Sequence, residues 1–74
     1  MKNYQINVLV ETHDEVTIEE RYIKTDAEKL DVQKAIDFVK LGGDKNVQSL
    51  LIALRVLGFT AREVKIDVDE SFDM

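Results

Sequence analysis

The sequence contains no cysteine, no proline and no tryptophan, and it has one histidine among 74 residues. The absence of cysteine excludes disulfides and metal sites built from thiolates, and it favours a cytoplasmic protein. A domain this small buries only about 60% of the surface of its unfolded chain. Its stability must therefore come from close packing or from association with other subunits.

Side chains that perform chemistry are also scarce. The serines are Ser49, inside a predicted helix, and Ser71, near the C-terminus, and neither is paired with a base. His13 lies in a polar turn, and its spacing from the neighbouring acids matches no known set of metal ligands. No glycine loop has the spacing that cradles phosphate. The sequence therefore predicts no catalytic residue, no cofactor and no metal site, and a protein that is not an enzyme.

Fifteen acidic and ten basic residues give a formal net charge of −5. Such a field repels phosphate backbones and anionic membranes and favours basic partners. No stretch reaches the roughly 18 apolar residues of a membrane span, and the first residues lack the apolar run of a signal peptide. We therefore expect a cytoplasmic protein with no membrane contact.

The first half of the chain predicts a β-hairpin. Its first strand has apolar residues at alternate positions, namely Tyr4, Ile6, Val8 and Val10. This period of two is typical of a strand with one apolar face. After a polar turn at 12–15, a second alternation places Val16, Ile18 and Tyr22 on one face, together with Glu20.

Two helices are predicted next. Thr25 and Glu28 have the spacing of a capping box, which would begin a helix that ends at Gly42-Gly43. Asp44 would cap a second helix, which Gly58 ends. In the following segment Val64, Ile66 and Val68 alternate with polar residues, which favours a strand over a short third helix.

The expected fold class is α+β, with the order β-β-α-α-β and a three-stranded sheet carrying two helices on one face. The alternative makes the last segment a short third helix. Residues 1–69 are predicted to form a single domain, and 70–74 a flexible acidic C-terminal tail.

The second helix carries more apolar surface than one sheet can cover. One stripe, predicted to face the sheet, contains Val47, Leu50, Leu51, Leu54 and Leu57. A second stripe of Ile52, Val56 and Phe59 lies nearly opposite and needs another cover. The other helix, the tail or a second subunit could supply it. We predict a face for self-association, or for a partner, formed by Ile52, Arg55, Val56 and Phe59, and a homodimer.

Two acidic regions suggest a protein partner with a basic surface. The predicted partner-binding surface contains Glu11, Asp14, Glu15, Glu19, Glu20, Asp26, Glu28 and Asp31. The tail places one aromatic among acids: Asp69, Glu70, Phe72 and Asp73. Such a segment can order as it binds a basic pocket, so its removal should leave folding intact and abolish binding.

The segment L-G-G-D-K-N-V, Leu41 to Val47, lies between the two helices and ahead of a strand. In element order, residues 16–69 resemble KH-type RNA-binding domains, whose G-x-x-G loop clamps a nucleic-acid backbone. Here the second glycine of that loop is missing. The resemblance implies a basic patch, which would be formed by Lys40, Lys45, Arg55 and Arg62.

Two function classes follow. The first is a small acidic, non-enzymatic protein that binds another protein as an inhibitor, adaptor or regulator. One version is a phage or mobile-element antagonist that mimics nucleic-acid charge. The alternative is a degenerate KH-like nucleic-acid-binding module, which the negative charge disfavours.

Overall fold

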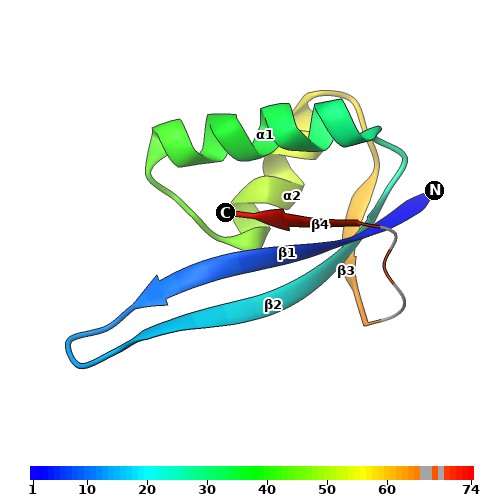
Figure 1. Ribbon diagram of the computed structural model, residues 1–74. Coiled ribbons are helices and arrows are strands. Elements are labelled where there is room, and N and C mark those ends of the chain that lie inside the picture. Colours follow the sequence, from blue (N-terminus) through cyan, green and yellow to red (C-terminus); the bar gives the residue numbers. More distant parts are fainter. Residues whose placement is uncertain (66–67, 69) are drawn as a thin grey trace.

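A computed structural model describes residues 1–65, 68 and 70–74 (Figure 1). Its elements are β1 (Lys2–Glu11), β2 (Val16–Thr25), α1 (Lys29–Gly42), α2 (Val47–Val56), β3 (Ala61–Val64) and β4 (Glu70–Asp73). The α+β class and the two helices are confirmed. The prediction of three strands is wrong, because the sheet has four and the order is β-β-α-α-β-β.

The sheet is mixed, with the strand order β3-β2-β1-β4. Strands β1 and β2 form the predicted antiparallel hairpin, closed where the Thr12 N–H donates to the Glu15 carbonyl at 2.9 Å. Strand β3 is antiparallel to β2, and β4 is parallel to β1. Residues 61–64 are thus a strand, as preferred from the sequence, whereas Ile66, Asp67 and Asp69 lie outside the described residues.

Both helices lie on one face of the sheet and leave the other uncovered (Figure 1). Tyr4, Ile6 and Val8 of β1 are buried beneath them, so the predicted apolar face of this strand is confirmed. The helices contribute Val32, Ala35, Ile36, Val39, Val47, Leu50, Leu51, Ala53 and Leu54 to the same core. One hydrophobic layer between helices and sheet therefore holds the domain together.

Strand β2 turns the opposite set of residues to the core from the one its apolar alternation suggested. Tyr4 lies opposite Ile23 in the ladder, so Ile23 and Thr25 share the covered face and are fully buried. Val16 and Ile18 lie on the uncovered face and are exposed. Because side chains alternate with period two, the core contact of Ile23 fixes the facing of the whole strand.

The predicted capping box is wrong, because Thr25 is the last residue of β2. Its hydroxyl accepts from the Ala27 N–H at 3.1 Å and donates to the Thr60 carbonyl at 2.7 Å. Helix α1 begins after Glu28, whose side chain makes no capping hydrogen bond. The predicted glycine stop is confirmed, since Gly43 follows the helix with φ of 81°.

Helix α2 is capped by Asn46 and not by Asp44, because the Asn46 side chain accepts from the Ser49 N–H at 2.9 Å. We expect Asn46→Ala to lower the free energy of unfolding by about 1 kcal/mol, the usual loss when a capping side chain is removed. Asp44→Ala is the control and should change little. Urea denaturation of the two variants measures the difference, and equal losses would contradict the assignment.

The C-terminal residues form strand β4 in place of the predicted flexible tail. Phe72 is only 6% exposed, and its ring meets Tyr4 edge to face with 5.5 Å between centroids. Met74 is also buried, and its backbone bonds to Asn7 and Leu9 of β1. The alternation of buried Phe72 and Met74 with exposed Ser71 and Asp73 is the pattern of a strand with one face in the core.

Candidate functional site

An apolar groove lies between the two helices on their solvent side. Three large side chains line it: Phe38 of α1, 71% exposed, and Ile52 and Val56 of α2, 57% and 80% exposed. Its volume is about 410 Å³, and small residues, Gly42 and Ala53 among them, complete the lining. The three large apolar side chains are therefore exposed around the groove, and no other part of the described chain covers them.

The groove follows from the apolar stripes of the helices. Each helix buries one stripe against the sheet, and 3.6 residues per turn carry the remaining apolar positions round to solvent. In α2 this places Ile52 and Val56 outside, as the second predicted stripe requires. In α1 it places Phe38 outside while Val39 is buried. The prediction omitted Phe38, although Leu30, Phe38 and Leu41 form a stripe in the sequence opposite the buried one.

Phe59, one of the predicted face residues, packs against the core instead. Gly58 turns the chain with φ of 99°, the Gly58 N–H donates to the Arg55 carbonyl, and the Phe59 N–H donates to the Leu54 carbonyl. This pair of bonds is a Schellman motif, which brings the residue after the glycine back onto the helix. Leu57, predicted to face the sheet, is consequently left outside and is 54% exposed.

Arg55 serves the fold at this same helix end. Its guanidinium donates from Nε and Nη2 to the Ala61 carbonyl, at 3.2 and 2.8 Å. These bonds connect the end of α2 to the start of β3. Of the four predicted face residues, the structure therefore brings only Ile52 and Val56 to the groove.

The helical part of the chain differs in charge from the rest. Residues 29–57 contain five basic and three acidic residues, whereas the remaining chain contains five basic and twelve acidic residues. The groove thus lies in the part of the molecule without a surplus of negative charge.

The acidic residues predicted as a partner surface do not gather on one face. Glu11, Asp14 and Glu15 lie at the tip of the hairpin. Glu19 and Glu20 are consecutive in β2 and point to opposite faces of the sheet.

The other three predicted acids lie at the opposite end of β2. Asp26 accepts from the Thr60 N–H at 2.9 Å, Glu28 precedes α1, and Asp31 lies in its first turn. Asp26 and Glu28 therefore have structural roles close to the helix start, away from the hairpin tip.

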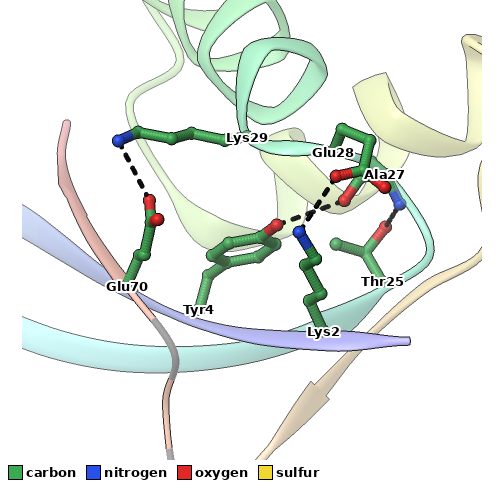
Figure 2. A network of polar contacts seen from close by, with 7 residues as sticks. All are labelled: Lys2, Tyr4, Thr25, Ala27, Glu28, Lys29 and Glu70. Carbon is green, nitrogen blue, oxygen red and sulfur yellow. Dashed lines mark hydrogen bonds and ion pairs between the residues drawn. The ribbon is translucent and has the colours of Figure 1, made fainter.

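Several acids near the helix start are paired with bases (Figure 2). Lys2 Nζ lies 3.0 Å from Glu28, and Lys29 Nζ lies 3.3 Å from Glu70, so ion pairs link α1 to β1 and β4. Tyr4 OH donates to the Ala27 carbonyl at 3.3 Å in the same network. The hydrogen bond to Glu28 raises the pKa of Lys2 above its usual value.

A second paired group lies on β2. Arg21 forms ion pairs with Glu19 and with Glu63 of β3. The hydrogen bond to Glu19 is the largest cause that raises the pKa of Arg21. Within the described residues, by contrast, the tip acids Glu11 and Asp14 form no ion pair.

The bases required for a nucleic-acid patch are distributed over several elements. Lys40 lies in the last turn of α1 and Lys45 in the loop that follows, Arg55 is bound to the Ala61 carbonyl, and Arg62 faces outward from β3 opposite Lys24. In the part of the chain that the structure describes, no group of histidines and acids could hold a metal ion. None of its helices is long and apolar enough to cross a membrane.

No family model, curated protein or solved structure matches this chain. The case for a function therefore depends on its exposed surfaces.

Proposed function

We propose that this is a small, non-enzymatic cytoplasmic protein that acts by binding other proteins, and that it forms a two-fold dimer through the groove between α1 and α2. The observation that supports the proposal is the groove itself, where Phe38, Ile52 and Val56 are all more than half exposed. Contiguous apolar surface of this kind usually marks an interaction site.

A second copy of the chain suits the groove in shape. In a two-fold contact the same patch serves both subunits, so Phe38 of one copy would enter the groove of the other. Ala53 and Gly42 leave space for such a ring. Burial of three large apolar side chains on each copy would also strengthen a domain of only 74 residues that has no disulfide.

A second copy also suits the groove in charge. Helix α1 and the loop that follows it carry both signs: Lys34, Asp37 and Lys40 in the helix, and Asp44 and Lys45 in the loop. Such a mixed surface has no large surplus of one charge that would repel a second copy.

The dimer would leave both acidic hairpins free. The partner protein is accordingly expected to offer a basic surface, and the protein to work as an inhibitor, an adaptor or a regulator.

Val56→Lys tests the dimer. A fully buried valine contributes about 1.5–3 kcal/mol, so the change should raise the dimer dissociation constant about tenfold or more. Sedimentation velocity over a range of concentrations measures the effect.

Val16→Lys is the matched control, because Val16 is exposed on the hairpin and the change adds the same charge. It should leave the dissociation constant unchanged. A wild-type protein that sediments as a monomer at every concentration would refute the proposed dimer, as would equal effects of the two substitutions.

A further inference from the structure

Strand β2 is longer than its neighbour β3. Strand β3 pairs with residues 22–25 of β2 and ends at Val64, opposite Tyr22. Within the described chain, residues 16–21 of β2 have a neighbour only on the β1 side, and Figure 1 shows this half of β2 as an open edge of the sheet. An open edge is a template for another strand.

Strand β1 shows which backbone groups face this edge. The Met74 N–H donates to the Asn7 carbonyl at 2.8 Å, and the Leu9 N–H donates to the Met74 carbonyl at 3.3 Å, so Asn7 and Leu9 turn these groups away from β2. Residues directly opposite in an antiparallel ladder exchange both hydrogen bonds or neither. Glu20 and Ile18, opposite Asn7 and Leu9, therefore turn their N–H and C=O groups to the open edge.

The space beside this edge is hollow on both faces of the sheet. A hollow of about 1050 Å³ is lined by Glu19, Glu20 and Arg21 of β2, by Val64 at the end of β3, and by Lys65 and Val68 of the segment that follows. A smaller hollow of about 210 Å³ lies on the helix side, between Glu19 and the start of α2 at Val47. These hollows leave space on both faces of the sheet beside residues 19–21 of β2.

The side chains along the edge set the chemistry of the occupant. Residues 11–20 include five acids and no lysine or arginine. On the uncovered face Val16 and Ile18 present apolar surface next to Glu20. On the helix side the edge presents Thr17 and Glu19, and Glu19 also pairs with Arg21. Like charges opposite each other are destabilising, so these acids disfavour pairing with the same edge of a second copy.

We propose that the edge of β2 at residues 16–20 binds an extended segment of another protein, in which basic and apolar side chains alternate. Its backbone pairs with Ile18 and Glu20, its apolar side chains lie beside Val16 and Ile18, and its basic side chains lie beside Glu19. This identifies the kind of partner for the proposed protein-binding function, on which it rests, and it uses a surface separate from the dimer groove.

The probe is a synthetic peptide that alternates lysine and valine and is as long as β2. The control peptide alternates lysine and proline, which keeps the charge but removes every second amide donor and disfavours strand pairing. We expect the lysine–valine peptide to bind about tenfold more tightly in isothermal titration, since each lost hydrogen bond costs about 1 kcal/mol. Equal affinities would show attraction by charge alone and would overturn the proposal.

Amide hydrogen exchange of the unaltered protein provides the second measurement. When the lysine–valine peptide binds, the Ile18 and Glu20 amides should exchange about tenfold or more slowly, because they gain partners. The Thr17 and Glu19 amides, which face β1, should change much less. An unchanged rate at Ile18 and Glu20 in the peptide-saturated protein would refute strand pairing.

Ile18→Pro removes one of these donors without removing a bond to β1, and proline is tolerated where the N–H side of an edge faces solvent. It should weaken peptide binding about tenfold, while Ile18→Thr, which keeps the N–H and the branched shape, should weaken it by less than about threefold. Equal losses in the two variants would contradict backbone pairing. Val56→Lys should leave peptide binding intact, so failure of the dimer and failure of the edge proposal are distinguishable.

Discussion

Phe72→Ala is expected to lower the free energy of unfolding by about 3–5 kcal/mol, the usual loss when a buried phenylalanine is truncated. Phe72 belongs to the buried core, and its ring meets Tyr4 edge to face. Because small domains are stable by only about 5–15 kcal/mol, the substitution would remove a large part of the total. The sequence alone predicted the opposite, that loss of the residues after Asp69 leaves folding intact.

Urea denaturation followed by circular dichroism gives the two free energies. Ser71→Ala is the control within β4, because Ser71 is exposed beside Phe72, and it should change stability by less than about 0.5 kcal/mol. A chain that ends at residue 69 should be largely unfolded. If Phe72→Ala proved as stable as Ser71→Ala, the docking of β4 would be refuted.

Leu54→Ala is expected to cost about 2–5 kcal/mol, because Leu54 is fully buried in α2 and its loss leaves a cavity. Leu57→Ala makes the same chemical change three residues later, at a side chain that is 54% exposed. It should cost less than about 1 kcal/mol. The urea denaturation midpoints of the two variants measure the two losses of stability.

The comparison tests the end of α2 directly. If the helix continued with a regular pitch, Leu54 and Leu57 would share a face and the two losses would be similar. The turn at Gly58 instead brings Phe59 to the core. Similar losses for the two leucines would contradict this arrangement.

Local patterns predicted those parts of the fold that depend on nearby residues. The alternation of Tyr4, Ile6 and Val8 predicted the face of β1, and the left-handed glycines at 43 and 58 marked the ends of both helices. The apolar alternation of Val16, Ile18 and Tyr22 indicated the wrong face of β2, because these three residues outnumber Ile23. Which face of β2 is buried depends on its register with β1 and on which side of the sheet the helices cover. No short window of sequence contains this information.

Strand β4 was missed for a similar reason. Its apolar signal consists of Phe72 and Met74 among acids, and composition alone favours a solvated tail. What orders it is the pairing with β1 and the contact with Tyr4, both of which are distant in sequence.

The candidate surfaces were predicted in part. Helical spacing separated Ile52 and Val56 from the sheet-facing stripe of α2, but it could not show that Phe38 of α1 lies beside them. The proximity of Phe38 to Ile52 and Val56 depends on how the two helices pack. The open edge of β2 was not predictable, because it arises from the difference in length between two paired strands.

The parallel pairing of β1 with β4 also bears on the order of folding. The Asn7 side chain donates to Asp73 at 3.0 Å across a separation of 66 residues. Hairpins form in about 1–10 μs, whereas contacts this distant must wait for a long loop to close. Until β4 docks, β1 is itself an open edge and Tyr4 lacks its aromatic partner. Docking of β4 therefore removes one of the unpaired strand edges that would otherwise be open to pairing with another chain.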